Sequence, residues 1–254
     1  MTSQPTSPQP NSPQPNSPWM HVFPGAPDAV ADLVCLPHAG GSASFFHPLA
    51  RLVAPRVRVL GVQYPGRQER RREPVVTDVR EIAAGVLDAL AGFGDRPVVY
   101  FGHSMGAVVA YEMAVVKSPA ALVVSGRRAP SRYRDETVHR RDDAGVVAEL
   151  RRLSGTHSAL LADPEVLELI LPAVRGDYQA IETYRHADAT PPLECPVTVL
   201  TGDTDPMVSA DEAADWQRHA RHPVDLRVYP GGHFFLVDHA VGIAETLVET
   251  ATSR

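Results

Sequence analysis

The segment Gly102-His103-Ser104-Met105-Gly106 restricts the fold of this chain more than any other. An apolar run at 97–101 precedes it and a helix-like run at 107–113 follows it. A serine on so sharp a strand-to-helix turn needs small residues two positions away on both sides, because the strand and the helix pass closely there. Glycines fill both positions. Gly-x-Ser-x-Gly also occurs by chance in ordinary turns, so the order of strand, turn and helix is what predicts a nucleophile elbow.

From Trp19 onward, short apolar runs alternate with amphipathic segments. This alternation is typical of an α/β fold, in which a mostly parallel sheet carries helices on both faces. The expected strands are 20–23, 31–36, 57–62, 98–101, 121–125, 197–201 and 226–229. The expected helices between them are 44–52, 79–91, 107–116, 210–221 and 234–250.

The alternation breaks between Arg127 and Pro192, where helical patterns at 144–153 and 164–184 follow one another without a strand. A helical insertion at this point predicts a lid over the active site, at about 128–192. Its apolar side chains either form the walls of an apolar pocket or pack against one another and the core. The candidates are Leu153, Leu160, Leu161, Leu167, Leu171 and Tyr178.

Length and charge limit the class of protein. The 254 residues, 44% of them hydrophobic, suffice for one large domain, which we favour over two. The net charge of −6 argues against nucleic acid as a main partner. No apolar run approaches the roughly 18 to 20 residues that cross a bilayer, and the N-terminus lacks the basic and apolar regions of a signal peptide. We therefore expect a soluble, cytoplasmic protein with no membrane partner.

The first 18 residues differ in composition from the rest of the chain. They repeat Ser-Pro-Gln-Pro-Asn at 7–11 and 12–16. Prolines at this spacing support neither helix nor sheet, and the segment has nothing apolar to bury. We expect a disordered tail at 1–18, followed by an α/β domain at 19–254. The alternative for the tail is a recruitment peptide.

A serine nucleophile requires a histidine base and an acid that orients the histidine. In this kind of fold the acid and then the histidine follow the serine along the chain, on loops at the carboxyl ends of strands. His233 follows the last expected strand, and both Asp203 and Asp205 follow the strand at 197–201. Either acid could be a turn residue that binds backbone amides. The stretch 202–205 resembles the Gly-x-x-Asp loop of α/β hydrolases, which favours Asp205 as the acid.

Attack by Ser104 would place negative charge on the substrate oxygen, which requires two backbone N–H donors. The residue after the nucleophile, Met105, supplies one donor. The glycine-rich turn at 36–42 follows an early strand, and we assign the second donor to Ala39. A phosphate-binding turn is the alternative reading, but the chain has neither a P-loop lysine pattern nor Gly-x-Gly-x-x-Gly.

The two cysteines do not indicate a metal site or a disulfide framework. Cys35 and Cys195 each lie beside an apolar run, with no metal-ligand partner nearby. We therefore expect both to be buried, reduced thiols.

Six segments together resemble the type II thioesterases of polyketide and nonribosomal peptide biosynthesis, and the resemblance extends from about Trp19 to the C-terminus. They are Cys35-Leu36-Pro37-His38-Ala39-Gly40-Gly41-Ser42, Gln63-Tyr64-Pro65-Gly66-Arg67, Gly102-His103-Ser104-Met105-Gly106, Val124-Ser125-Gly126-Arg127-Arg128-Ala129-Pro130, Gly202-Asp203-Thr204-Asp205-Pro206 and Gly231-Gly232-His233-Phe234-Phe235.

The resemblance implies an α/β hydrolase that removes acyl groups from the phosphopantetheine arm of an acyl or peptidyl carrier protein. Ser104 would attack the thioester, with His233 as the base and Asp205 as the orienting acid. The resemblance also implies a monomer without a metal or redox cofactor. A small-molecule esterase or lipase, a noncatalytic carrier-binding module and an enzyme releasing a finished product remain as alternatives.

Two groups of basic residues suggest how an acidic carrier protein would dock. Residues 127–152 carry eight arginines against five acidic residues, and Arg67, Arg70, Arg71 and Arg72 form a second cluster. Arginines bind phosphate and steer acidic partners, so some of them could guide the carrier protein to the site. A solvated lid and loop surface is the alternative.

Overall fold

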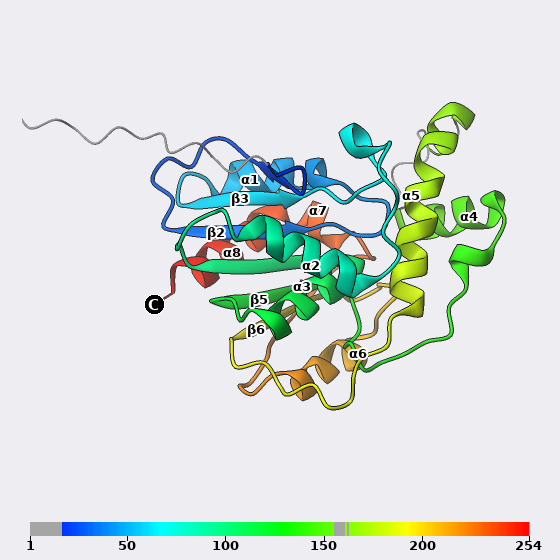
Figure 1. Cartoon of the computed structure of the whole chain (residues 1–254). Helices are drawn as coiled ribbons and strands as arrows, with labels where there is room; N and C mark the ends of the chain where they lie inside the picture. Colours follow the sequence, from blue (N-terminus) through cyan, green and yellow to red (C-terminus); the bar gives the residue numbers. More distant parts are fainter. Residues whose placement is uncertain (1–16, 155–160, 162, 254) are drawn as a thin grey trace, which may run out of the picture.

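A computed structural model describes residues 17–154, 161 and 163–253 (Figure 1). Within them the strands form one sheet in the order β1-β3-β2-β4-β5-β6-β7. Only β1 pairs antiparallel, and all other neighbours are parallel, which confirms the mostly parallel sheet. The strands are β1 (Met20–Val22), β2 (Ala31–Leu36), β3 (Val57–Val62), β4 (Val98–His103), β5 (Ala121–Ser125), β6 (Val197–Gly202) and β7 (Asp225–Tyr229).

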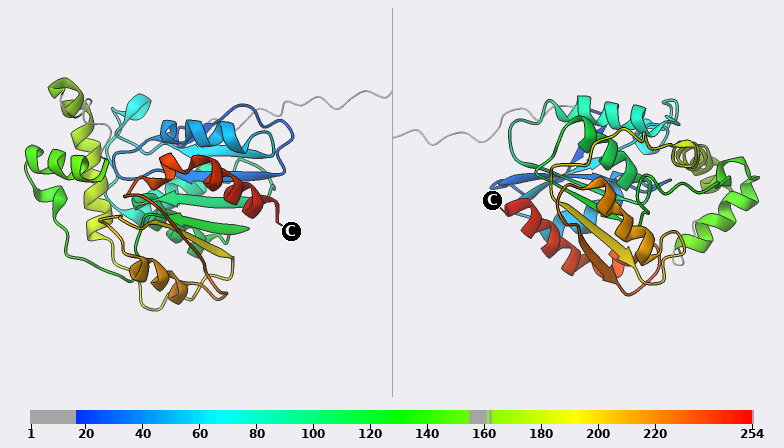
Figure 2. Two further views of the ribbon diagram at one scale, coloured as in Figure 1. Left: turned by 180° about the vertical axis from the view of Figure 1, so that it is seen from behind. Right: turned by 90° about the horizontal axis from the view of Figure 1, so that it is seen from below.

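Helices cover both faces of the sheet. Helices α2 and α3 lie on one face and α1 and α8 on the other, as the front and back views show (Figures 1 and 2). The helices are α1 (His47–Val53), α2 (Val79–Leu90), α3 (Met105–Val116), α4 (Asp143–Ser154), α5 (Pro164–Thr183), α6 (Ala210–Ala214), α7 (Phe235–Asp238) and α8 (Ala240–Thr252). Short 3-10 turns lie at Ala43–Phe46, Gln68–Arg70, Val138–Arg140 and Asp215–His219.

The central strands β2, β4, β5 and β6 are mainly apolar and are buried along almost their whole length, because helices cover both faces of the sheet. Successive residues of β2 pack into different cores: Leu33 and Cys35 pack with α1 and α8, whereas Val34 and Leu36 pack with α2 and α3. Each fully buried valine or leucine contributes about 1.5–3 kcal/mol to folding. Cys35 and Cys195 are buried and neither forms a disulfide, as expected.

Three of the expected helices are interrupted. The expected helix at 44–52 begins as a 3-10 turn, and the one at 210–221 ends as a 3-10 turn. The expected helix at 234–250 is two helices, because His239 has φ −107° and ψ 23°, which lies outside the helical region. The apolar periodicity of the sequence continues through all three interruptions, so it could not predict where they lie.

Helices α4 and α5 form an insertion between β5 and β6, and their ends lie within one residue of the helices expected at 144–153 and 164–184. They stand at one end of the sheet, opposite the C-terminus (Figure 1). The expected tail lies outside the described residues up to position 16, so the division into tail and domain stays a prediction. Among the described helices, none is long and apolar enough to cross a membrane.

Candidate active site

Ser104 occupies a strained turn between β4 and α3. Its φ of 55° and ψ of −116° are sparsely populated for a residue with a side chain. A Cβ at Gly102 would lie 2.1 Å from the carbonyl oxygen of Gly106, and a Cβ at Gly106 would lie 2.1 Å from that of Leu36. Only glycine fits at either position, so the predicted nucleophile elbow is present.

Three side chains from separate loops form a continuous chain of hydrogen bonds. Ser104 Oγ lies 3.0 Å from His233 Nε2, and His233 Nδ1 lies 2.9 Å from Asp205 Oδ2. His233 is 2% exposed and Asp205 9%, so water does not compete for the contact between them. The loops meet because β4, β6 and β7 are parallel and end at the same edge of the sheet. This geometry allows His233 to take the Ser104 proton while Asp205 orients the ring.

The loop after β2 lies beside Ser104. Ala39 lines the same pocket as Ser104 and His233. Its N–H has no hydrogen-bond partner among the described residues. Met105 is the first residue of α3, where N–H groups lack an acceptor within the helix. Both predicted donors are thus available beside Ser104.

A second histidine, His103, packs against His233 with ring centroids 5.0 Å apart. Its Nδ1 lies 3.0 Å from Ser125 Oγ. Burial, reinforced by the neighbouring His233 ring, holds the pKa of His103 well below its usual value. A neutral His103 adds no positive charge next to the ring that must become cationic.

A pocket of about 250 Å³ opens at Ser104 beneath the inserted helices. Of the side chains proposed from the sequence, Leu153, Leu161 and Tyr178 line it. Leu171 instead packs in a small core of the insertion, with Leu167 beside it, and Leu160 lies outside the described residues. The remaining lining residues are His38, Ala39, Gly40, Ser104, Leu150, Val166, Ile170, Val174, His233 and Phe234. Such a wall suits an apolar acyl chain.

A second hollow of about 570 Å³ adjoins this pocket, and Gly40 and Ile170 line both. The polar residues that line the second hollow are Ser42, Arg67, Gln68 and Arg71. Arg71 is exposed and, within the described part of the chain, has no carboxylate partner. It is therefore free to bind an anion from solution.

Most of the other arginines that the sequence singled out are occupied by internal partners. Arg67 and Arg70 are buried and ion-paired with Asp177 and Glu73. They are therefore structural residues, which narrows the proposed docking cluster at 67–72 to Arg71 and Arg72.

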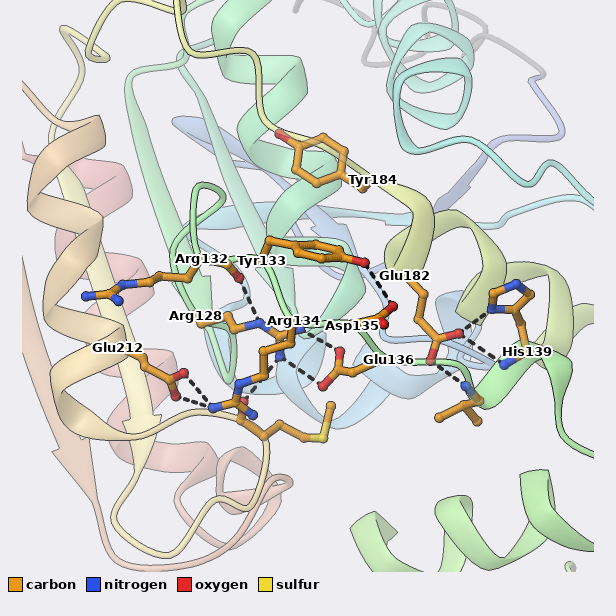
Figure 3. Close-up of polar contacts among 12 residues, drawn as sticks. Arg128, Arg132, Tyr133, Arg134, Asp135, Glu136, His139, Glu182, Tyr184 and Glu212 are labelled. Atoms are coloured by element: carbon orange, nitrogen blue, oxygen red, sulfur yellow. Dashed lines mark hydrogen bonds and ion pairs between the residues drawn. The ribbon is translucent and has the colours of Figure 1, made fainter.

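The segment from β5 to α4 holds a network of ion pairs (Figure 3). Arg128 binds Glu136, and Arg134 binds Glu212 at the start of α6. Glu182 accepts the N–H groups of Val138 and His139 and also contacts the His139 ring. These contacts attach the root of the insertion to the core, and the arginines in them are not free for a partner.

The residues that sequence reasoning missed are the buried pair Arg67 and Asp177. Arg67 belongs to the recognisable segment 63–67, but the basic cluster in which it lies suggests either a docking surface or a solvated loop and not a buried side chain. Asp177, which is fully buried on α5, carried no local signal. Within the described ranges, no group of three or more His, Cys, Asp and Glu side chains could hold a metal ion.

The mostly parallel sheet, the elbow serine and the hydrogen-bonded histidine and aspartate define an α/β hydrolase. Residues 31–250 match the thioesterase domain family, and the chain belongs to that family.

Similar proteins are themselves named as thioesterases. The chain is 49% identical over 230 residues to a probable cadicidin biosynthesis thioesterase of Streptomyces griseus, covering 87% of this chain and 62% of that protein. It is 48% identical to the thioesterase PikA5 of Streptomyces venezuelae, covering 87% and 80%. The structure of the type II thioesterase BorB from the borrelidin biosynthetic cluster superposes with a TM-score of 0.85 at 45% identity, covering 92% and 97%. The chain thus spans less than two thirds of the length of the Streptomyces griseus relative.

Proposed function

We propose that this protein hydrolyses acyl thioesters on the phosphopantetheine arm of acyl or peptidyl carrier proteins and so clears blocked sites of a polyketide or nonribosomal peptide assembly line. The observation that carries the proposal is the hydrogen-bond chain from Ser104 through His233 to Asp205, at the mouth of an apolar pocket. The family and the biosynthetic setting of the relatives supply the thioester as substrate.

In the first half of the reaction, Ser104 Oγ attacks the thioester carbonyl carbon while its proton moves to His233 Nε2. The carbonyl oxygen becomes an oxyanion, which the N–H groups of Ala39 and Met105 bind. Collapse of this intermediate breaks the carbon–sulfur bond. The leaving sulfur takes the proton from His233 and departs as the carrier thiol, and Ser104 keeps the acyl group as an ester.

In the second half, water attacks the acyl ester of Ser104 and gives a proton to His233 Nε2. The same two N–H groups bind the second oxyanion. When the intermediate collapses, Ser104 Oγ takes the proton back and the free acid leaves. Asp205 stabilises the cationic His233 ring in both halves, and no group other than these residues and water takes part.

The apolar pocket and the adjoining polar hollow fit the two parts of such a substrate, its acyl chain and its phosphopantetheine arm. The apolar pocket would take the acyl chain, and the polar hollow at Arg71 would take the arm, whose phosphate an arginine binds well. We further propose that the enzyme acts without a cofactor, as a monomer, in the cytoplasm with its synthase.

The test incubates the wild type and Ser104→Ala with carrier proteins that bear short and long acyl chains, and follows the free acid and holo-carrier by mass spectrometry. Hydrolysis by the wild type alone supports the proposal. Turnover of simple esters without turnover of any carrier thioester would instead indicate an esterase. Carrier binding without turnover would indicate a noncatalytic module. Strong preference for one finished chain over short ones would indicate product release rather than editing.

A further inference from the structure

The segment 63–67 holds the loop at 37–42 along its length. The hydroxyl of Tyr64 donates to the carbonyl oxygen of Pro37 at 3.2 Å. Arg67 Nη1 donates to the carbonyl oxygen of Gly41 at 3.0 Å. Gln63 Oε1 accepts the N–H of Ala43, just after the loop, at 2.9 Å. Both ends of the loop that presents Ala39 are therefore fixed by one neighbouring segment.

The middle of the loop is held by helix α5 instead. Asp177 Oδ2 accepts the N–H of Gly40, the residue after Ala39, at 2.7 Å. The same carboxylate forms a two-point contact with Arg67, at 2.6 Å through Nη1 and 2.7 Å through Nη2. Asp177 is fully buried and Arg67 is 7% exposed, so neither charge is satisfied by water. One carboxylate thus joins the inserted helix to the loop and to the segment that holds the loop.

Steric contacts join α5 to the loop at the same place. Gly40 has φ +75°, and a Cβ there would lie 2.8 Å from Val174 Cγ2, three residues before Asp177. Gly176 similarly lets α5 approach the side chain of Val75. The C-terminal half of α5 is therefore packed against the rim of the site, whereas Pro164 and Glu165 at the start of the helix are exposed.

We propose that Asp177 is a positioning residue: through the N–H of Gly40 it fixes the peptide plane next to Ala39, so that the position of α5 sets the geometry of the oxyanion site. This inference rests on the proposed function insofar as Ala39 is taken to bind the oxyanion. It assigns the buried pair of Asp177 and Arg67 a role in transition-state binding in addition to folding.

The physical reason is that an oxyanion donor acts through distance and direction. Donors that are fixed before the reaction pay no cost of reorganisation when charge develops, and the loss of one donor lowers kcat by about 100- to 1000-fold. Without Asp177, the N–H of Gly40 would lack its buried acceptor. The backbone of the loop would then change conformation so that this N–H reaches another acceptor. Ala39 would then be misdirected rather than removed, so we expect a loss of about 10- to 100-fold in kcat.

The test uses a double variant, Arg67→Met with Asp177→Leu, which removes both charges together and so leaves neither of them buried without a partner. Asp177→Asn is the conservative variant, because its amide oxygen can still accept the N–H of Gly40. Asp143→Asn is the matched control: Asp143, on α4, forms an exposed ion pair with Arg175 of α5 and does not touch the loop.

Each variant is assayed for kcat and KM on an activated small ester, and for binding of an alkyl boronic acid, which forms a tetrahedral adduct with the serine. Binding of the corresponding alkyl carboxylic acid measures ground-state affinity. Thermal unfolding reports whether the variant is folded.

We expect kcat and the affinity for the boronic acid to fall by similar factors in the folded double variant. KM and the affinity for the carboxylic acid should change less than about twofold. Asp177→Asn should recover part of the loss, and Asp143→Asn should match the wild type. Unchanged kcat in the folded double variant overturns the proposal, and so does an equal loss of boronate and carboxylic-acid binding, which would indicate general damage to the pocket. A wild type that reacts with the ester and the boronate but with no carrier thioester overturns the proposed substrate alone.

Discussion

Asp203 and Asp205, two positions apart after β6, hold two different parts of the loop that carries His233. Asp205 Oδ2 lies 2.9 Å from His233 Nδ1, and its Oδ1 accepts the N–H of Met207 at 2.8 Å. Asp203 Oδ1 accepts the N–H of Gly231 at 2.8 Å and does not reach the ring. One acid therefore orients the imidazole, and the other shapes the backbone before it.

Replacing these two acids should have different effects. Asp205→Asn preserves the shape of the site but no longer fixes the required tautomer of His233, so kcat should fall by about 10⁴-fold. Asp203→Asn keeps an oxygen that can accept the N–H of Gly231, so stability should change by less than about 1 kcal/mol and kcat by less than about tenfold. Steady-state kinetics on one thioester, paired with urea unfolding, checks both variants. If kcat fell more in Asp203→Asn than in Asp205→Asn, Asp203 and not Asp205 would be the acid that orients His233.

Two buried arginines should respond in opposite ways to removal. Arg67→Met leaves Asp177 buried without its partner, so the free energy of unfolding should fall by about 3–5 kcal/mol. Arg127 is 8% exposed and has no ion-pair partner in the described part of the chain. Burial, with Arg128 nearby, lowers its pKa to about 9. Arg127→Met should therefore leave stability unchanged within about 1 kcal/mol or raise it.

Urea unfolding of both variants at neutral pH provides the measurement, and Arg51→Met on the exposed face of α1 is the control. A large loss of stability in Arg127→Met would mean that the guanidinium of Arg127 forms a strong stabilising interaction.

Acid should destabilise the fold through His219. Burial, followed by the neighbouring His186 ring, lowers the pKa of His219 to about 4. Between pH 6.5 and 4 the unfolded chain binds the proton and the folded chain does not, so stability falls as pH falls through this window. With allowance for solvent screening, the loss from pH 7 to pH 5 is about 1 kcal/mol.

His219→Gln should show a smaller decrease over this interval, as measured by urea midpoints at the two pH values. If the variant and the wild type lost the same stability, His219 would not be a source of the acid sensitivity.

The apolar pocket should set the preference for acyl length. Val166 lines the pocket from the first turn of α5, so Val166→Trp fills part of its volume. We expect kcat/KM for an octanoyl thioester to fall at least about tenfold, with little change for acetyl. Glu168→Trp, on the exposed face of the same turn, is the control. Equal losses for both chain lengths would place the acyl group elsewhere. A series of acyl-pantetheine substrates gives the profile.

Arg71 should matter for a carrier protein and not for a small substrate. Arg71→Glu reverses the charge in the hollow beside the site, so kcat/KM on an acyl carrier protein should fall by about tenfold, most strongly at low salt. The same variant should hydrolyse a small activated ester, which lacks a phosphate, at the wild-type rate. Arg51→Glu, on α1, is the charge-matched control. Unchanged carrier kinetics in Arg71→Glu would contradict the docking role.

Local chemistry in the sequence determined the alternating elements, the elbow and the candidate triad. Ser104, Asp205 and His233 could be predicted because an elbow needs two glycines, and because loops at the carboxyl ends of parallel strands meet at one edge. The breaks at His239 and after Ala214 could not be predicted, since apolar periodicity runs through a change of helix type without a change in pattern.

Only the tertiary structure decided which of the polar residues face inward. In sequence, Arg67 and Arg71 belong to one basic cluster, yet Arg67 is buried against Asp177, whereas Arg71 is exposed. Asp177 lies 110 positions from Arg67, and no local pattern connects the two. The sequence by itself determined the groups that can carry out the chemistry. Long-range packing decided how they are held, because burial of a charge depends on partners that only the folded chain brings together.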